Sequence, residues 1–152
     1  MNAPSDNIDV NFGACHSGIM KSRFSLPLFA LLLGACAISA DALITDPSNG
    51  CVVQNPNPRS GESISWSGER RGGLAHGTGT VSWFLHGAPN GRYEGMVVNG
   101  RMNGTGTAFY PSGNRYVGEF RDGIPDGRGT YILADGREIT GDWQAGRWRA
   151  DD

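Results

Sequence analysis

A short motif recurs at a fixed spacing and dominates the second half of the chain. Tyr93, Tyr116 and Ile139 each lie two residues before a glycine and start units that are 23 residues apart. Trp66 starts an earlier unit of the same kind, with four extra residues before Tyr93. The sequence therefore predicts three full units and a partial fourth that ends near Arg149. A fixed period of this length indicates a repeat protein, in which each unit is one supersecondary element.

Alternation within a unit predicts its local structure. Tyr116, Gly118 and Phe120 alternate with Val117 and Glu119, which is the period-2 pattern of a strand with two unlike faces. A glycine inside such a strand leaves room for a ring from a neighbouring strand to lie against the backbone. A disordered glycine-rich tail would not keep this register over three periods. Each unit is therefore expected to be a β-hairpin.

Two stretches resemble MORN (membrane occupation and recognition nexus) repeats. They are Tyr-Glu-Gly-(x4)-Gly-(x3)-Gly-Thr-Gly at 93–106 and Tyr-Val-Gly-Glu-Phe-(x2)-Gly-(x3)-Gly-Arg-Gly-Thr-Tyr at 116–131. The resemblance covers roughly residues 64–149. It implies a module for interaction or scaffolding and not a catalyst, and arrays of this family are associated with membrane attachment, phospholipid contact and self-association.

The expected fold is all-β. Tandem hairpins should occupy residues 63–150, in units that start near 66, 93, 116 and 139. Because each unit of a repeat array contacts mainly its neighbours, these hairpins are expected to stack into one elongated, twisted antiparallel sheet.

The N-terminal part has the pattern of an export signal. Residues 1–19 contain no Lys or Arg, so they lack the positive region with which a secretory signal begins, and we interpret them as a non-structural extension before a start at Met20. If Met1 is the true start, the leader is unusually long. Residues 20–35 fit a signal peptide, because two basic residues precede the apolar run Phe24–Ala35. This run is too short to span a bilayer, which takes about 20 apolar residues.

The apolar run ends in Leu33-Gly34-Ala35-Cys36, which resembles the lipobox of bacterial lipoproteins. The resemblance implies that Cys36 is the first mature residue and carries a diacylglyceryl thioether and an amide-linked acyl chain such as palmitate. Ala37 follows it instead of aspartate, which implies an outer-membrane lipoprotein facing the periplasm. The alternative is an ordinary signal peptide cut after Ala37 or Ala42, which would release a soluble periplasmic protein.

Residues 36–62 are rich in Pro, Asn, Ser and Gly, and we interpret them as a flexible tether between the anchor and the repeats. Within this segment, Val52 and Val53 could add a short strand that covers the first repeat. Cys51 has no obvious disulfide partner, since Cys36 is expected to be modified or removed.

The candidate binding residues are rings and arginines that repeat in phase. Four rings could form an aromatic ladder on one face of the sheet, either packed on one another or partly open to a partner: Trp66, Tyr93, Tyr116 and Trp143. Arg92 and Arg115 each precede a repeat tyrosine and could stack on rings or contact phosphates. They could equally reflect a lysine-poor composition, because eleven arginines and no lysine follow Cys36.

The sequence offers little support for catalysis. His76 is expected in a turn and His86 in the four-residue insertion, and the pair lacks the helical spacing of metal ligands. No metal site and no cofactor are therefore expected. The recurring carboxylates are expected to be solvated on a thin sheet: Glu69, Glu94, Glu119 and Asp142. Charge is nearly balanced, which argues against nucleic acid as a partner.

Together these features predict a non-catalytic interaction or scaffold module anchored at the bacterial cell envelope. Its expected partners are the membrane, through the lipid anchor, an unidentified envelope protein and a second copy paired through a sheet edge. The alternative is a glycan or peptidoglycan binder that uses the aromatic face, which requires at least two of the four ladder rings to be exposed in a groove.

Overall fold

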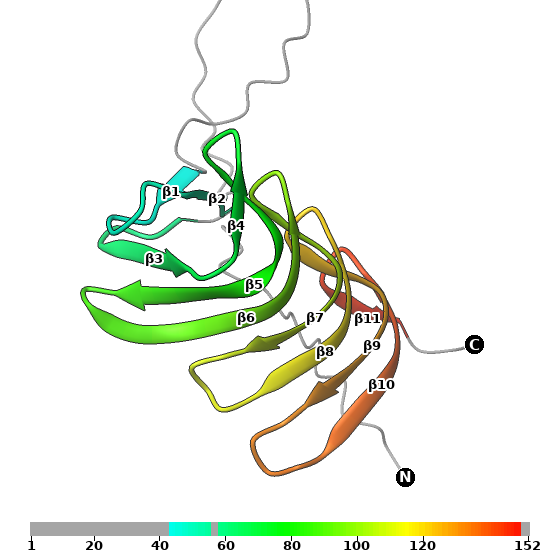
Figure 1. Cartoon of the computed structure of the whole chain (residues 1–152). Coiled ribbons are helices and arrows are strands. Elements are labelled where there is room, and N and C mark those ends of the chain that lie inside the picture. Colours follow the sequence, from blue (N-terminus) through cyan, green and yellow to red (C-terminus); the bar gives the residue numbers. More distant parts are fainter. Residues whose placement is uncertain (1–42, 56–57, 150–152) are drawn as a thin grey trace, which may run out of the picture.

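The computed structural model describes residues 43–55 and 58–149, which form eleven strands in one sheet (Figure 1). Every regular element in these residues is a strand, so the expected all-β class is confirmed. The expected extension 1–19, signal peptide 20–35 and lipidation site Cys36 lie outside the described residues. The strands are β1 (Leu43–Thr45), β2 (Val52–Gln54), β3 (Glu62–Trp66), β4 (Glu69–Arg71), β5 (Leu74–Leu85), β6 (Ala88–Val98), β7 (Arg101–Phe109), β8 (Arg115–Arg121), β9 (Ile124–Ile132), β10 (Glu138–Gln144) and β11 (Arg147–Arg149).

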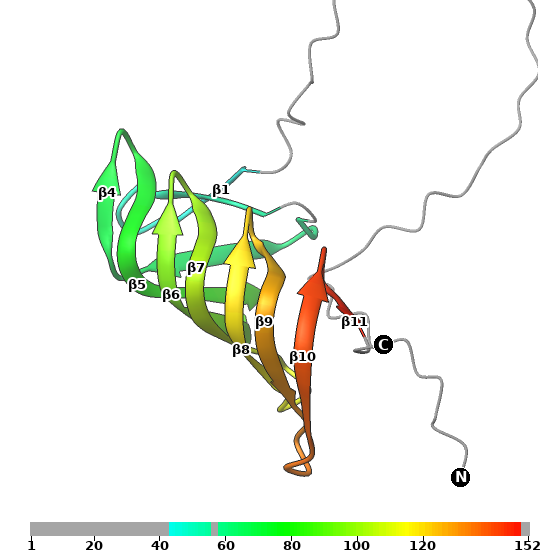
Figure 2. The ribbon, with the colours of Figure 1, turned by 90° about the vertical axis from the view of Figure 1, so that its right-hand side faces the viewer.

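The strands from β5 to β11 follow one another in chain order, and each is antiparallel to its neighbours. They lie side by side in a ribbon, as the turned view shows (Figure 2). The register shifts within three of the pairings, β5–β6, β6–β7 and β8–β9. Because such irregularities bend and twist strands, they account for the curl of the ribbon (Figure 1).

Two-residue turns join strands at one end of the ribbon. Asn99, Asp122 and Ala145 have φ values of 50°, 49° and 51°, and each is followed by a glycine with positive φ. Two successive residues with positive φ define the type I′ turn, whose twist matches that of a hairpin. The glycines of the repeat are therefore needed for this turn as well as for ring packing.

These turns also hold each unit to the preceding one. In three successive units, the N–H of the turn glycine donates to a backbone carbonyl near the start of the second strand of the preceding unit. The residue before that glycine donates its own N–H to a side chain, which belongs to the residue directly after that carbonyl. The backbone bonds run from Gly100 to Ala75, from Gly123 to Met102 and from Gly146 to Pro125, and the side-chain acceptors are His76, Asn103 and Asp126.

The turn position expected for His76 is wrong. His76 lies within β5 opposite Glu69, and its Nδ1 accepts the N–H of Asn99 at 3.4 Å. Its place in the unit is that of Asn103 and Asp126, so what the position requires is an acceptor for the next turn. The expectation that His86 sits in the insertion is met, since it lies in the β5–β6 turn with a φ of 51°.

The core is a column of rings on one face of the sheet, which we call the inner face. Tyr93 and Tyr116 are 0% exposed, and each forms a T-shaped contact with the Phe120 ring, at centroid distances of 4.9 and 5.2 Å. Each ring covers glycines: a Cβ built on Gly106 would lie 2.4 Å from the Tyr93 ring, and one on Gly129 would lie 2.2 Å from the Tyr116 hydroxyl. The expected use of strand glycines as ring seats is confirmed.

The hydroxyl groups of these two tyrosines are bonded inside the column. Tyr93 donates to the carbonyl of Met96 at 2.9 Å, and Tyr116 donates to that of Glu119 at 3.2 Å. Burial disfavours the phenolate, and it raises the pKa of each tyrosine from 10.0 to about 12. The folded state is therefore stabilised relative to the unfolded state as long as both phenols stay protonated.

This shift predicts alkaline sensitivity with a defined window. The contribution of both tyrosines is complete below pH 10, where unfolded tyrosine is protonated, and falls as pH rises to about 12. We expect the free energy of unfolding of wild type to decrease over this interval more than that of the Tyr93→Phe/Tyr116→Phe variant. Denaturant titrations at fixed pH, with tyrosinate absorbance followed in parallel, test this. Full ionisation of both phenols near pH 10 in the folded protein would contradict it.

The residues before the first repeat are folded where the structure describes them. Residues 43–55, within the segment 36–62 expected to be a flexible tether, form β1, a turn and β2 packed on the first unit. The strand expected at Val52 and Val53 is β2. β2 runs across the first two of the turns at this end of the ribbon, because the N–H groups of Val52 and Gln54 donate to the carbonyls of Gly73 and Gly100. We call residues 43–55 the cap. Cys51, within the cap, is a free and fully buried cysteine.

Candidate functional site

The four rings of the expected aromatic ladder do lie in the inner-face column, but they are buried. Their exposed fractions are 4% for Trp66, 0% for Tyr93 and Tyr116, and 2% for Trp143. The Trp143 indole contacts the Tyr116 ring and donates to the carbonyl of Gly129 at 3.1 Å. These rings pack on one another and on backbone, so the groove of exposed ladder rings that the glycan alternative requires is not formed.

Arg92 and Arg115 lie on the opposite face, which we call the outer face, and one ring separates them. Arg92 of β6 pairs with Phe109 of β7, and Phe109 pairs with Arg115 of β8. The three side chains form a row across three strands, which we call the Arg-Phe-Arg row. Neighbouring strands are about 4.8 Å apart, so the two arginines start about 10 Å from each other.

Arg92 stacks on an aromatic ring, which is one of the two roles predicted for it. The ring is that of Phe109 and not that of a repeat tyrosine. Its Cζ lies 3.7 Å from the centroid of the Phe109 ring. Its Nε donates to Oε1 of Glu94 at 2.7 Å, and both side chains are 47% exposed. Among the described residues, none accepts a hydrogen bond from its two terminal nitrogens. The guanidinium is held in place by its flat face and one edge, and the other edge remains available.

Arg115 is exposed, and within residues 43–55 and 58–149 it forms no ion pair. It lies between Phe109 and Ile132, its register partners on the two neighbouring strands. Both neighbours are apolar, so the charge of Arg115 is not compensated along the row. The Arg-Phe-Arg row is therefore a place where a cation lacks a counter-ion.

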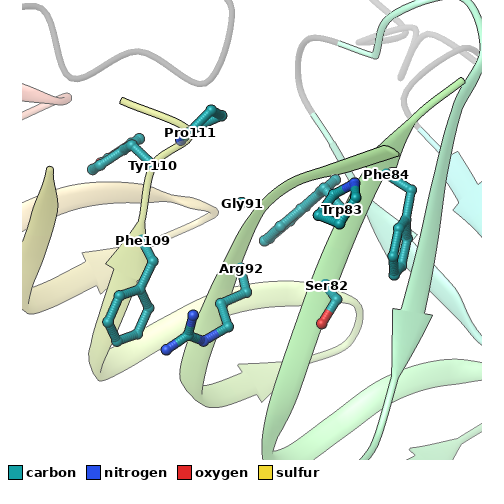
Figure 3. Close-up of a pocket in the computed structure, with 9 residues that line it drawn as sticks. Ser82, Trp83, Phe84, Gly91, Arg92, Phe109, Tyr110 and Pro111 are labelled. Carbon is teal, nitrogen blue, oxygen red and sulfur yellow. The ribbon is translucent and has the colours of Figure 1, made fainter. Parts of the chain in front are cut away.

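A recess of about 310 Å³ opens beside this row (Figure 3). In Figure 3, Tyr110 and Pro111 lie on one side, Trp83, Phe84 and Ser82 lie on the other, and Gly91 lies between them. Arg92 and Phe109 also line the recess, and Pro89 completes its wall. Most of the lining is aromatic or aliphatic, with one guanidinium at its margin.

The recess exists because the first hairpin is longer than the others. β5 has 12 residues and β6 has 11, whereas β7 has nine and β8 has seven. The β7 partner of β6 ends at Phe109, so the end of the long hairpin extends past the turn that contains Pro111. Gly91 keeps this junction narrow, because a Cβ there would lie 2.8 Å from the carbonyl oxygen of Phe109 and its φ is +114°. The four-residue insertion thus creates the recess.

A second groove, of about 450 Å³, lies at the turn end of the ribbon. Its cation, Arg101, is already engaged: the guanidinium donates to the side chain of Gln54 and pairs with Asp122 at 3.3 Å. Charges in this groove are compensated internally, which makes it a weaker candidate than the recess.

Three of the four recurring carboxylates are paired with, or lie opposite, an arginine or a histidine. Glu94 is paired with Arg92, Glu69 faces His76 across strands, and Asp142 lies opposite Arg128 and Arg149. Within the part of the chain that the structure describes, no group of three or more His, Cys, Asp or Glu side chains is placed to hold a metal ion.

Comparison with known families identifies the repeat. The model of the MORN repeat matches residues 93–115 and 116–136. Residues 93–136 thus form two tandem MORN repeats. The first matched repeat contains Phe109, Tyr110, Pro111 and Arg115, so the Arg-Phe-Arg row and the recess lie where it meets the preceding hairpin. No curated protein matches the chain. The described residues contain no helix long and apolar enough to cross a bilayer.

The sequence pattern indicates Arg92 and Arg115 as candidate binding residues but does not indicate Phe109 or the recess. A signal for Phe109 was present, because it occupies an outer-face position at which the next unit carries Ile132, and a large ring there has no core to enter. The recess had a weaker signal in the insertion before Tyr93, which lengthens one hairpin only.

Proposed function

We propose that this protein is a non-catalytic interaction module held at the bacterial cell envelope by a lipid anchor on Cys36. The observation that carries the interaction part is the pair of tandem MORN repeats, which suggests a module for protein or membrane interaction. The ribbon form supports it, because the outer face of the sheet and its edges are open to partners. The expected partner is an envelope protein, and no cofactor takes part.

The lipobox resemblance at residues 33–36 supports the anchor, with the protein on the periplasmic side of the outer membrane. A soluble periplasmic form is the alternative. The first described strand, β1, begins at Leu43, so the acyl chains would hold the folded domain close to the membrane surface. Lipid attachment by the chain's own acyl groups leaves the MORN ribbon available for protein contact.

A second copy remains a proposed partner through the last strands. β10 pairs with β9 from Glu138 to Trp143, but β11 covers it only from Asp142 to Gln144. On the side of β10 that faces away from β9, part of the strand thus has no strand partner among the described residues, which supports pairing between chains. Arg147 and Arg149 on β11 limit how far such pairing extends, since charges on an edge strand oppose it.

Two linked measurements test the proposed function. Mass spectrometry of the mature protein is expected to show an acylated N-terminal cysteine at position 36, and the Cys36→Ser variant is expected to lose membrane association. Cross-linking and co-purification of the tagged wild type from membranes are expected to recover one specific envelope protein, whereas titration with cell-wall fragments should leave tryptophan fluorescence unchanged. An unmodified mature protein would contradict the anchor. A fluorescence response to glycan without a protein partner would contradict the interaction module.

A further inference from the structure

We propose that the recess and the Arg-Phe-Arg row together bind an extended acidic segment of a partner protein, with an apolar side chain in the recess and a carboxylate between Arg92 and Arg115. This inference rests on the proposed interaction function and specifies the chemistry of the partner.

The charge requirement follows from what the two arginines lack. Arg92 gives its Nε to Glu94 and keeps two terminal nitrogens for another acceptor, and Arg115 has no counter-ion within the described part of the chain. Two guanidinium groups about 10 Å apart at their backbones can both reach one carboxylate. A carboxylate matches the planar donor fork of arginine. The row is thus built to receive a carboxylate.

The ring between the arginines makes the site rigid before binding. The Arg92 guanidinium is stacked 3.7 Å from the Phe109 centroid and bonded to Glu94, so it has already lost much of its rotamer freedom. A preorganised cation binds its anion at a lower entropic cost than a mobile surface arginine. The glutamate is part of this positioning, and its own charge is taken up by Nε.

The recess sets the second requirement, an apolar side chain. Its volume of about 310 Å³ is at the lower end of the range for ligand pockets, about 300 to 1,000 Å³. The lining includes Pro89 and Pro111, which have no backbone N–H to donate. Addition of a partner strand beside these prolines is therefore disfavoured, and recognition depends on side chains.

The surrounding charges favour a protein segment over a lipid surface. Adsorption on anionic lipid needs several uncompensated cations on one surface. Glu94, Glu119, Glu138 and Asp142 are exposed on the same outer face as Arg92 and Arg115, and the whole chain has a net charge of -2. One short acidic segment satisfies the two arginines without bringing a whole anionic surface against these carboxylates.

The test is a selection that does not presuppose a sequence. Random heptapeptides displayed on phage are selected on the immobilised mature protein, and the recovered peptides are synthesised with a fluorescent label. We expect an acidic residue beside a large apolar one. Substitution of Arg92→Gln or Arg115→Gln is expected to weaken binding about tenfold each, because each removes a charged hydrogen-bond donor to the carboxylate. Added salt should weaken binding by wild type.

Arg128→Gln is the matched control, because Arg128 is also exposed and lies on β9, the next strand after that of Arg115. It should bind the selected peptides as wild type does, and unfolding midpoints of all variants should agree. Peptides that lack acidic residues, or that bind the Arg92→Gln/Arg115→Gln variant as tightly as wild type, would overturn the proposal. Sedimentation with phosphatidylglycerol vesicles that requires both arginines would also overturn it, in favour of a membrane contact.

The failure of this site is distinguishable from the failure of the proposed function. If the double variant still co-purifies the envelope protein recovered with wild type, the interaction module stands and the recess is not its site. If wild type recovers no specific protein, the proposed function itself fails.

Discussion

Replacing Gly118 by alanine is expected to lower the free energy of unfolding by about 3 kcal/mol or more. A Cβ at this position would lie 2.5 Å from Cα of Gly129, 2.6 Å from the carbonyl oxygen of Arg128 and 2.6 Å from the Tyr116 hydroxyl. Two of these three atoms belong to the backbone of β9, which cannot rotate away. The methyl group must therefore separate β8 from β9 or expel the tyrosine ring from its seat.

Denaturant unfolding followed by tryptophan fluorescence measures this effect. Val117→Ala is the matched control, because Val117 precedes Gly118 on β8 but is 42% exposed on the outer face. It removes apolar surface without adding a clash, so a change of well under 1 kcal/mol is expected. Gly118 does not have a positive φ, so strain of the left-handed region cannot explain a loss. Equal stability of the two variants would contradict the ring-seat account.

The repeat and its strands could be predicted because the same alternation of rings and glycines occurs in several units. Rings and glycines alternate in Tyr116-Val117-Gly118-Glu119-Phe120, and β8 has this inner and outer alternation in the structure. One such segment would be ambiguous. Recurrence after 23 residues removes the ambiguity, because each unit meets the same neighbours and needs the same residue at each position.

The degree of burial of the rings could not be predicted from this pattern. Alternation shows that Tyr93 and Tyr116 share a face, but a flat single sheet would leave that face open to solvent. The curl of the ribbon, with its irregular register near Gly95 and Gly118, brings the rings into edge contact and buries them. Curvature depends on pairing between strands, which no short stretch of sequence specifies.

The recess and the cap could not be predicted for a different reason. Each depends on a contact that occurs at one place in the protein and does not recur in the other units. The recess forms only where the longer hairpin passes the turn after Phe109. The cap is held by Asp46, 20 residues before Trp66 in sequence, whose carboxylate accepts the Trp66 N–H at 2.8 Å. In the sequence, Asp46-Pro47-Ser48-Asn49-Gly50 resembles any turn of a tether. Its role becomes visible only when the strand it binds is known.

That role predicts a large effect for Asp46→Asn. The carboxylate is 1% exposed and accepts four hydrogen bonds: Oδ1 from the Ser48 amide and hydroxyl, and Oδ2 from the Asn49 side chain and the Trp66 amide. An asparagine in the same position keeps one oxygen but turns an NH₂ group toward two of these donors. Removing the acceptor of two donors around this buried carboxylate is expected to lower the free energy of unfolding by about 3 kcal/mol.

The same carboxylate predicts an acid sensitivity that the variant should lose. Burial alone would raise the pKa of Asp46, but the hydrogen bonds from Ser48, Trp66 and Asn49 outweigh it and hold the pKa below the ordinary value of 3.8. The stabilisation is therefore complete above about pH 4 and is lost as pH falls through the lower pKa of the folded state. Wild type should lose unfolding free energy over this acid range by more than Asp46→Asn does.

Asp135→Asn provides the comparison, because the pKa of Asp135 is also lowered, through its bonds to the Arg137 backbone and side chain, but its side chain lies in solvent. A surface pair of this kind is screened and contributes little. Denaturant titrations between pH 2 and 7, in the span where unfolding is reversible, distinguish the two aspartates. If Asp46→Asn keeps the acid dependence of wild type, this carboxylate does not hold the cap. The packing of residues 43–55 onto the first repeat then rests on the apolar contacts of Ile44 and Val53 and on the backbone hydrogen bonds of β2.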